Sequence, residues 1–392
     1  MLFILLFGTM LMVGIVENIK GVSYPLIREE FNASWDQMGL LVSMLTIAYT
    51  GFSVIASMYL GRFGVKPSFL LGFFGLFAGL IAVFCMPGFF LAAASLFVIF
   101  ASYGIFEIGV NALASKLFVK RAALLMNLLH SFYGLGAVIG PITAGIVAGN
   151  MGLNWRYAYI VYLPLALALF IPAVVVRFPG NEAETQTANG KADGRAVGNE
   201  ERKGFLSALR SPLVWLMSVT LGVMVAVEIA SANWGAMYFQ DMHNLDPNTE
   251  GAAFVARFFV IFTISRLVSG LFIERIGYLR SLLGASMISL VILITGFLLG
   301  SQGIFVLPAL GFFAAIFWPT LLAIAFVHFG RDAPVFSGAI IAISGIFSAG
   351  IQFLVGLTNQ VLGSAWGYRS TVVYAAILII LLIILYRKFP KK

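Results

Sequence analysis

Residues 180–203 read GNEAETQTANGKADGRAVGNEERK, a polar stretch in a 392-residue chain in which 61% of the residues are hydrophobic and 10% are charged. A soluble domain carries about 25% charged residues, so the rest of this chain is too apolar to fold in water. The polar stretch has few apolar residues and no periodicity, which is typical of a linker. We therefore divide the chain into residues 1–177, a linker at 178–212, and residues 213–392.

Each apolar part contains six runs long enough to cross a hydrocarbon core of about 30 Å, which takes about 20 residues of helix. The backbone must be satisfied internally in lipid, so runs of this length are helices. The sequence thus predicts an all-α membrane protein with twelve transmembrane helices, and the apolar run at Leu2 is the first span rather than a cleaved signal. The predicted spans are 2–28, 38–61, 67–86, 89–115, 123–149, 157–177, 213–239, 250–273, 281–299, 303–328, 335–361 and 369–387.

The net charge of +8 comes from Lys and Arg side chains that gather in the loops on one side of these spans. The loops on the other side contain only three basic residues, Arg28, Arg156 and Arg369. The positive-inside rule then places both termini and the linker on the cytoplasmic side. We expect the protein in the plasma membrane of the cell. The basic excess is explained by orientation, so we expect no nucleic acid partner.

The two apolar parts resemble each other at corresponding places. Arg62-Phe63-Gly64 follows the second span, and Arg275-Ile276-Gly277 follows the eighth at a common offset. Val16-Glu17 in the first span matches Val227-Glu228 in the seventh. Two matches in register indicate a duplicated arrangement of six helices.

The loops that contain the repeated Arg-x-Gly also suggest a family. Gly61-Arg62-Phe63-Gly64-Val65-Lys66 and the copy at 274–280 resemble the acid-Arg-x-Gly-x-basic signature of the major facilitator superfamily, although Gly61 replaces the acid in the first copy. The resemblance implies two pseudo-symmetric six-helix bundles with a cavity between them. We assign gating roles to the charged residues of these loops and to one arginine near the cytoplasmic end of the eighth span: Arg62, Lys66, Arg266, Glu274 and Arg275.

Three stretches resemble the fucose permease and glucose/mannose symporter branch of that superfamily: Phe106–Asn111, Asn127–Gly136 and Val227–Trp234. Another stretch, Gly136–Gly145 in the fifth span, resembles the glycine-proline signature of drug/proton antiporters. Small residues spaced by four also let helices approach closely, so packing alone explains much of this second pattern.

Three acids fall within spans: Glu17, Glu107 and Glu228. An ionised acid in the membrane is costly, so each one either carries a proton or ties helices together as a protonated or paired group. Lys20 follows Glu17 by three residues and can pair with it on one helix face. Glu107 has fewer charged neighbours and is the better proton carrier. The resemblance places helices 1, 4 and 7 around the cavity, so we assign proton coupling to Glu17, Lys20, Glu107 and Glu228.

A polar solute needs hydrogen-bonding and aromatic side chains in the cavity. Asn111 lies four residues after Glu107 and so shares its helix face. Tyr238 and Trp366 lie near helix ends, where such residues are typically interface anchors. The candidates for solute binding are Asn18, Tyr24, Asn111, Asn127, His130, Tyr133, Asn233, Trp234, Trp318 and Gln352.

The sequence has no P-loop, no Gly-x-Ser-x-Gly motif and no metal-ligand spacing among its three histidines, so we expect no enzyme, cofactor, metal or ATP-driven pump. We expect a monomeric secondary transporter that couples protons to the transport of a small polar solute, a monosaccharide or related polyol. A drug/proton antiporter is the alternative, favoured by the glycine-proline run and the three acids. A non-transporting receptor with the same fold is a third interpretation.

Overall fold

The computed structural model describes residues 1–118, 122–179 and 205–389. All elements in these ranges are helices, and 12 helical segments are long and apolar enough to cross a membrane. This confirms the predicted fold class of an all-α protein with twelve membrane spans. Most predicted linker residues lie outside the described ranges, and the described part of the linker contains the short helix α10 (Phe205–Leu209).

The first six spans follow one another with short connections. They are α1 (Leu2–Asn18) with α2 (Lys20–Glu30), α3 (Trp35–Phe63), α4 (Val65–Cys85), α5 (Phe89–Leu117), α6 (Ala122–Gly145) with the π-helical turn η1 (Ile146–Asn150), and α7 (Tyr157–Ile160) with α8 (Leu163–Val175).

The last six spans follow the same order. They are α11 (Pro212–His243), η2 (Pro247–Gly251) with α12 (Ala252–Val268) and α13 (Gly270–Ile276), α14 (Tyr278–Leu298), a segmented tenth span, η5 (Gly330–Asp332) with α18 (Ala333–Leu362), and α19 (Trp366–Arg369) with α20 (Thr371–Lys388). The tenth span comprises η3 (Gly300–Gln302), α15 (Gly303–Val306), η4 (Leu307–Ala309), α16 (Leu310–Ala314) and α17 (Phe317–Phe329).

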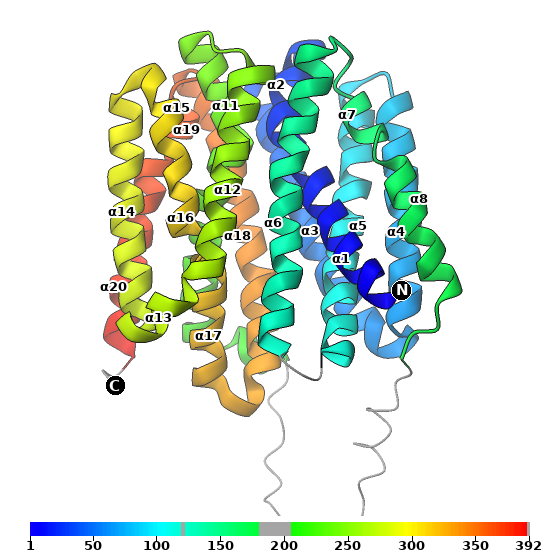
Figure 1. Cartoon of the computed structure of the whole chain (residues 1–392). Helices are drawn as coiled ribbons and strands as arrows, with labels where there is room; N and C mark the ends of the chain where they lie inside the picture. Colours follow the sequence, from blue (N-terminus) through cyan, green and yellow to red (C-terminus); the bar gives the residue numbers. More distant parts are fainter. Residues whose placement is uncertain (119–121, 180–204, 390–392) are drawn as a thin grey trace, which may run out of the picture.

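The helices stand side by side, so the molecule has two ends (Figure 1). We call the end where α8 finishes and α11 starts the linker end; the C-terminus also lies there (Figure 1). We call the opposite end, which carries the turns after α2 and α11, the distal end.

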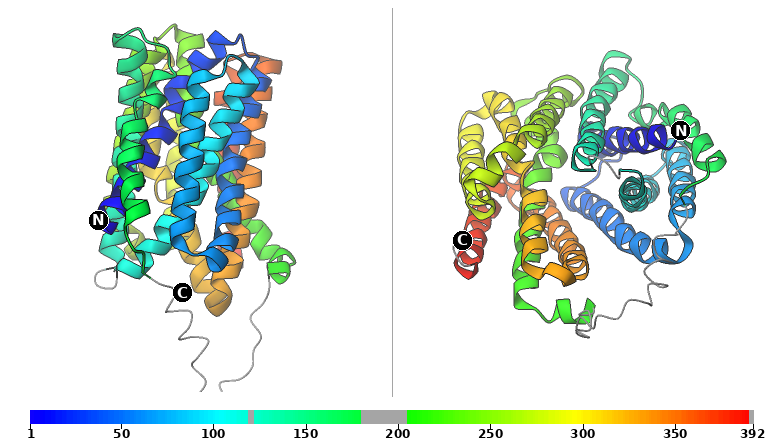
Figure 2. Two further views of the ribbon diagram at one scale, coloured as in Figure 1. Left: turned by 90° about the vertical axis from the view of Figure 1, so that its right-hand side faces the viewer. Right: turned by 60° about the horizontal axis from the view of Figure 1, so that its bottom comes forward.

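Contacts between helices form within and between the two sets of spans. Within the sets, α1 packs on α6, α4 on α5, α11 on α18 and α14 on α20. Between the sets, α3 packs on α18, α6 on α12 and α2 on α11. Figure 2 shows the blue and cyan helices of the first set opposite the yellow and red helices of the second. The six elements α2, α3, α6, α11, α12 and α18 therefore line the junction where residues of both sets meet.

Several spans are divided into helical segments, among them the first and the tenth. The first is divided at Ile19, between Glu17 and Lys20, and Pro25 lies inside its second segment, α2. The tenth span contains Pro308 and Pro319, which lack a backbone N–H, and it divides into short helical segments. The spans predicted at 2–28 and 303–328 are both present, as Leu2–Glu30 and Gly300–Phe329, and each is divided into helical segments.

The glycines of α6 form a packing surface for α1. A Cβ at Gly136 or Gly140 would collide with the carbonyl oxygens of Leu11 and Ile15. A Cβ at Gly14 would collide with the carbonyl oxygen of Tyr133. The glycine-rich run in α6 thus lets α1 approach closely, and this approach brings Glu17 next to Tyr133.

The repeated loops contain glycine for a conformational reason. Gly64 lies between α3 and α4 with φ 86°, and Gly277 lies between α13 and α14 with φ 92°. Both values are in the region that glycine adopts without a steric penalty. The two Arg-x-Gly copies therefore form equivalent sharp turns at the linker end of the two sets of spans.

Candidate functional site

The acids lie deep in the spans rather than at their ends. Glu17 is near the middle of the span Leu2–Glu30, and Glu228 is near the middle of Pro212–His243. Glu107 lies ten residues before the linker end of α5, which is roughly 15 Å along the helix axis. These depths are where a charged side chain in a membrane protein needs a partner or a role.

Glu17 has two partners from two helices. The Nζ of Lys20 lies 3.3 Å from Oε1 of Glu17, and the hydroxyl of Tyr133 donates to Oε2 at 2.9 Å. The Lys20 ammonium also lies 4.8 Å from the centroid of the Phe100 ring in α5. The Glu17–Lys20–Tyr133 cluster therefore joins α1, α2 and α6, and its ion pair follows the spacing of three seen in the sequence.

Glu107 and Asn111 also lie on one helix face. The Nδ2 of Asn111 donates to Oε1 of Glu107 at 3.0 Å. The Oδ1 of Asn111 is buried and has no hydrogen-bond partner among the described residues. His130 in α6 interacts electrostatically with Glu107. Asn111 thus presents an unused acceptor next to a carboxylate, which suits a solute hydroxyl group.

The second set of spans contributes a buried amide network. The Nε1 of Trp234 donates to Oε1 of Gln352 at 2.7 Å, and Nδ2 of Asn233 lies 3.4 Å from the same oxygen. The Nε2 of Gln352 donates to the carbonyl oxygen of Ala226 at 3.1 Å. The polar groups of Gln352 and Trp234 are therefore engaged with the protein. The Oδ1 of Asn233 is buried and has no partner in the described part of the chain.

Arg266 lies in the last turn of α12, near the linker end of the candidate span Pro247–Val268, as the sequence predicted. Helix α13 follows and ends ten residues later at Ile276, roughly 15 Å further along the axis. Arg266 interacts electrostatically with Glu228 in α11, and with His130 and Tyr133 in α6. Glu228 also interacts with Glu17. Arg266 and the three acids thus belong to one electrostatic cluster that includes residues of both sets of spans.

Several other predicted site residues take part in local contacts. The Nδ2 of Asn18 donates to the carbonyl oxygen of Gly14 at 2.8 Å, so this amide is used within its own helix. Tyr24 is buried in α2 and interacts electrostatically with Glu17. Trp318 is half-buried in α17. The side chain of Asn127 lies outside the described part of the structure.

The predicted gating residues differ in their surroundings. Lys66 donates to the carbonyl oxygens of Val174 and Val176 at the end of α8, the latter at 3.1 Å. This contact ties the turn after α3 to the sixth span. Arg275 is exposed at the end of α13. The side chains of Arg62 and Glu274 lie outside the described part.

Tyr238 is not the interface anchor that the sequence suggested. It is buried at 2% exposure, packs on Phe239 and Tyr368, and its hydroxyl accepts from Nε of Arg369 at 3.2 Å. Its place near the end of a span was misleading, because α19 and α20 cover this part of α11. Trp366 is 52% exposed, as an anchor requires.

The distal end holds a contact between the two sets of spans that the sequence analysis missed. The Nη1 of Arg28 in α2 lies 3.2 Å from Oδ1 of Asp241 in α11, and its guanidinium stacks on Trp35 at 3.9 Å from the ring centroid. The backbone N–H of Trp35 donates to Oε1 of Gln360 in α18 at 3.1 Å. The sequence signal for the Arg28–Asp241 contact was a pair of opposite charges near the ends of spans 1 and 7.

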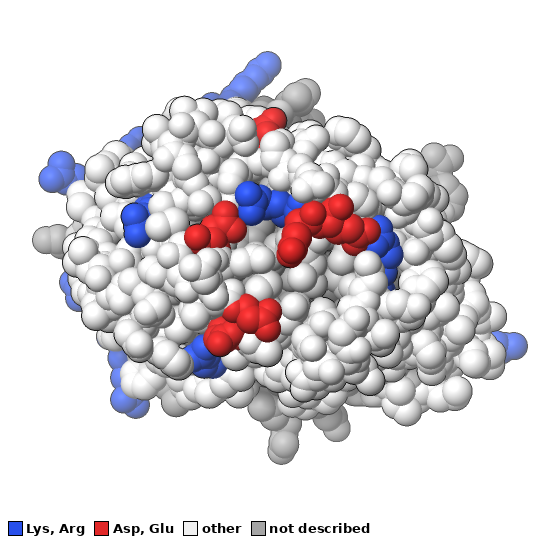
Figure 3. All heavy atoms as spheres, turned by 90° about the horizontal axis from the view of Figure 1, so that it is seen from above, with Lys and Arg blue, Asp and Glu red and all other residues white. Residues whose placement is uncertain are grey.

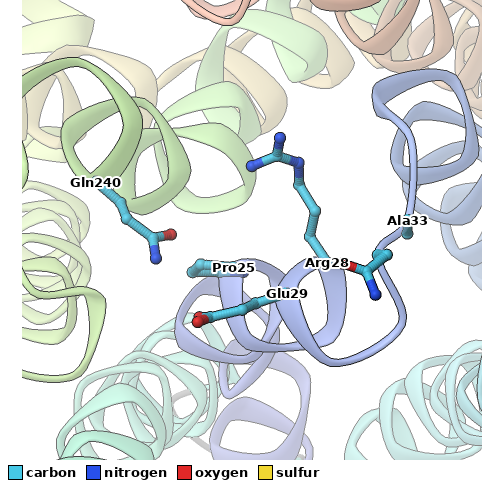
Figure 4. Close-up of a pocket in the computed structure, with 6 residues that line it drawn as sticks. Pro25, Arg28, Glu29, Ala33 and Gln240 are labelled. Atoms are coloured by element: carbon cyan, nitrogen blue, oxygen red, sulfur yellow. The ribbon is translucent and has the colours of Figure 1, made fainter.

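The distal face around this contact is charged and hollowed. Figure 3 shows acidic and basic side chains gathered near the centre of that face. A pocket of about 320 Å³ lies there between α2 and α11, lined in part by Arg28, Glu29 and Gln240 (Figure 4). A second ion pair on this face, between Arg156 and Glu30 at 2.6 Å, lies within the first set of spans. Arg28–Asp241 is therefore the ion pair of this face that connects the two sets.

Curated proteins with similar sequences are transporters by name, but the matches are partial. A "Probable actinorhodin transporter" of Streptomyces coelicolor is 24% identical over 163 residues, which cover 41% of this chain and 28% of that protein. A "Probable sulfoacetate transporter SauU" of Cupriavidus necator is 29% identical over 145 residues, which cover 36% of this chain and 32% of that protein. The chain thus matches about a third of the length of each relative.

Solved structures match over almost the whole chain. The E. coli fucose:proton symporter FucP aligns with a TM-score of 0.66 at 17% identity, over 100% of this chain and 98% of that one. A bacterial homolog of the human lysosomal transporter Spinster aligns with a TM-score of 0.77 at 14% identity, over 98% and 96%. At these identities the matches concern the fold. The model of one family, the Major Facilitator Superfamily, matches residues 5–351, and the chain belongs to that family.

Proposed function

We propose that this chain is a proton-coupled transporter that moves a small polar solute, a monosaccharide or related polyol, across the cell membrane by alternating access. The observation that carries the proposal is the presence of three acids, Glu17, Glu107 and Glu228, inside spans from both sets. Acids that face a transport path can take up a proton on one side of the membrane and release it on the other.

The acids differ in their partners, and the proposed roles differ accordingly. Glu17 is held by Lys20 and Tyr133, so its protonation would loosen a contact between α1, α2 and α6. Glu107 accepts from the Asn111 amide and has no ion pair among the described residues. We therefore assign the transported proton to Glu107, and a switching role to Glu17. Glu228 is the second candidate for the proton.

The solute class follows from an unused hydrogen-bond acceptor. The Oδ1 atom of Asn111 is buried without a partner in the described part of the structure, and a solute hydroxyl group would satisfy it. Trp318 is half-buried and could pack on the apolar face of a sugar ring. The fold likeness to the fucose:proton symporter FucP agrees with this class of solute.

Drug/proton antiport is the second candidate function. The relative named as a probable actinorhodin transporter favours it. The glycine-proline run in α6 does not support antiport further, because the close packing of α6 on α1 explains Gly136 and Gly140. The relative named as a probable sulfoacetate transporter indicates that organic anions also belong among the solutes to be tested.

Alternating access requires the two sets of spans to separate at one end at a time. In this structure they are joined at the distal end by Arg28–Asp241 and by Trp35–Gln360. We propose that residues 1–177 and 213–392 move as the two halves about the 178–212 linker, and that the linker end faces the cytoplasm. The turns at Lys66 and Arg275 would then control the cytoplasmic opening. The path lies within one chain, so a monomer suffices.

Transport in proteoliposomes tests this function. Vesicles containing the purified chain receive a pH gradient, acidic outside, and labelled monosaccharides, polyols, organic anions and a cationic dye are supplied in turn. We expect one of the polar solutes to accumulate above its external concentration, and an uncoupler to abolish the accumulation. Extrusion of the dye against its gradient, without accumulation of any polar solute, would support the antiporter instead.

A further inference from the structure

Arg266 differs from Lys20, Arg28 and Arg156 in the partners of its charge. Lys20, Arg28 and Arg156 each have a carboxylate within 3.3 Å. Arg266 has no carboxylate within ion-pair distance among the described residues, and its Nε is buried without a hydrogen-bond partner there. A partly buried guanidinium without an ion-pair partner is costly, so its retention within the span points to an anion that binds there during function.

The guanidinium lies over an aromatic ring. Its central carbon lies 4.5 Å from the centroid of the Phe262 ring, one turn earlier in α12, and Phe262 is itself buried at 3% exposure. Stacking on an aromatic ring covers one face of a guanidinium and leaves its N–H edges available. A carboxylate fits two parallel N–H groups of such an edge better than a neutral hydroxyl does.

The surroundings of Arg266 come from both sets of spans. Glu228 of α11, Tyr49 of α3, and His130 and Tyr133 of α6 all interact with it electrostatically. His130 also interacts with Glu107, whose neighbour Asn111 presents the unpartnered amide oxygen. A solute bound at Arg266 would therefore lie among groups of both halves, as an alternating-access carrier requires.

We propose that Arg266 binds the carboxylate of the transported solute, and that the solute is a sugar acid: a polyhydroxylated compound with one carboxylate group. This inference rests on the proposed function, since it assigns the solute class of the same transport site. The carboxylate accepts from the Arg266 guanidinium, and hydroxyl groups of the solute donate to the unpartnered oxygen of Asn111. Glu107 and Glu228 repel this carboxylate when ionised, and a proton taken up with the solute removes part of that repulsion.

Binding of matched acids and neutral analogues to the purified full chain tests the proposal. Gluconate is compared with glucitol, and glucuronate with glucose, by thermal stabilisation and calorimetry. We expect the acid of at least one pair to bind about tenfold or more tightly than its neutral analogue, the size expected for charge-assisted hydrogen bonds. Arg266→Gln should weaken acid binding by a similar factor. Arg266→Lys should retain part of it, because it keeps the charge and loses the planar fork.

Arg257 provides a matched control on the same helix. Its Nε donates to the carbonyl oxygen of Ala253 at 3.0 Å, and its guanidinium stacks on Phe305. Arg257→Gln should therefore leave acid binding unchanged. Since Arg266 has no carboxylate partner, Arg266→Gln should also unfold at or above the parent's temperature without solute. A marked loss of stability in this variant would instead indicate a structural role and contradict the proposal.

Three further outcomes would overturn the inference. They are neutral analogues that bind as tightly as the acids, no binding of either acid, and acid binding that persists in Arg266→Gln. The proposed function fails separately. If acids bind through Arg266 but a pH gradient does not drive their accumulation, the assignment of the solute as a sugar acid is supported and proton coupling is contradicted. If a neutral sugar accumulates with protons and no acid binds, proton coupling is supported and the assignment of the solute as a sugar acid is contradicted.

Discussion

Asn111 uses its amide nitrogen for Glu107 and keeps its amide oxygen free for a solute. We expect Asn111→Ala to raise the solute dissociation constant roughly fivefold, which corresponds to about 1 kcal/mol for one hydrogen bond. Accumulation driven by the pH gradient should persist at saturating solute, because no charge changes. Calorimetry and uptake measure the two effects.

The control for this substitution is Ser115→Ala. Ser115 lies one turn further along the same helix, is exposed, and donates to the carbonyl oxygen of Ala112. Its removal should leave the affinity unchanged. Equal affinity of Asn111→Ala and the parent would remove Asn111 from the solute site.

Lys20 is the cationic partner of Glu17 within an interrupted helix. The two side chains are 9% and 18% exposed, so Lys20→Met leaves a largely buried carboxylate without its cation. We expect the free energy of unfolding to fall by about 2 kcal/mol, less than for a fully buried pair. Thermal unfolding in detergent measures the change.

The double variant Glu17→Gln with Lys20→Met separates the charge effect from lost packing. It leaves no unpaired charge, so its unfolding temperature should recover most of the loss. A double variant as unstable as Lys20→Met alone would show that the ammonium acts through packing on Phe100 rather than through the carboxylate.

At the level of elements, closure of the distal end depends on α2, α3, α11 and α18. Gly39 of α3 and Gly356 of α18 are in backbone contact, and Ser43 donates to the carbonyl oxygen of Ala349 at 2.7 Å. Arg28–Asp241 joins α2 to α11 near the same level. These contacts between the sets must break together when the distal end opens.

Asp241→Asn should shift the molecule toward a state that is open at the distal end. The side chains of the Arg28–Asp241 pair are 30% and 20% exposed, so its loss is worth about 1 kcal/mol, or roughly a fivefold change in the population ratio. Spin labels at the exposed residues Leu153 and Leu362, in a Cys85→Ser background, report the separation of the two sets.

The matched control is Glu30→Gln, which breaks the ion pair to Arg156 on the same face. That pair lies within the first set of spans, so the label separation should stay as in the parent. If both variants open the distal end equally, the change reflects lost surface charge and not the contact between the sets.

For the whole molecule, we expect the linker end to face the cytoplasm. The sequence basis is the positive-inside distribution of Lys and Arg. In intact cells, a membrane-impermeant thiol reagent should label Leu153→Cys at the distal end and not Lys388→Cys at the end of α20. Both variants carry Cys85→Ser. The reverse labelling pattern would invert the topology.

Local patterns in the sequence predicted the fold and part of the candidate site. The apolar runs determined the twelve spans, and spacings of three and four placed Lys20 beside Glu17 and Asn111 beside Glu107. Contacts between distant parts could not be predicted this way. The partners Arg28 and Asp241 are 213 residues apart, and Trp234 and Gln352 are 118 apart. No local periodicity encodes such pairs.

The neighbours of Arg266 were also hidden from the sequence. Arg266 lies at the end of an apolar run, so it was expected near the cytoplasmic end of the span, and it lies in the last turn of α12. Its electrostatic neighbours come from α3, α6 and α11 and were accessible only through the packing of those helices.

Comparing exchange with accumulation in Glu107→Gln tests proton coupling most directly. Glutamine resembles the protonated acid in shape and cannot release a proton, so the loaded carrier should still reorient. We expect counterflow of the solute in proteoliposomes at a rate near that of the parent, and no accumulation driven by a pH gradient. If Glu107→Gln concentrates the solute as well as the parent does, Glu107 does not carry the coupled proton and the account is contradicted.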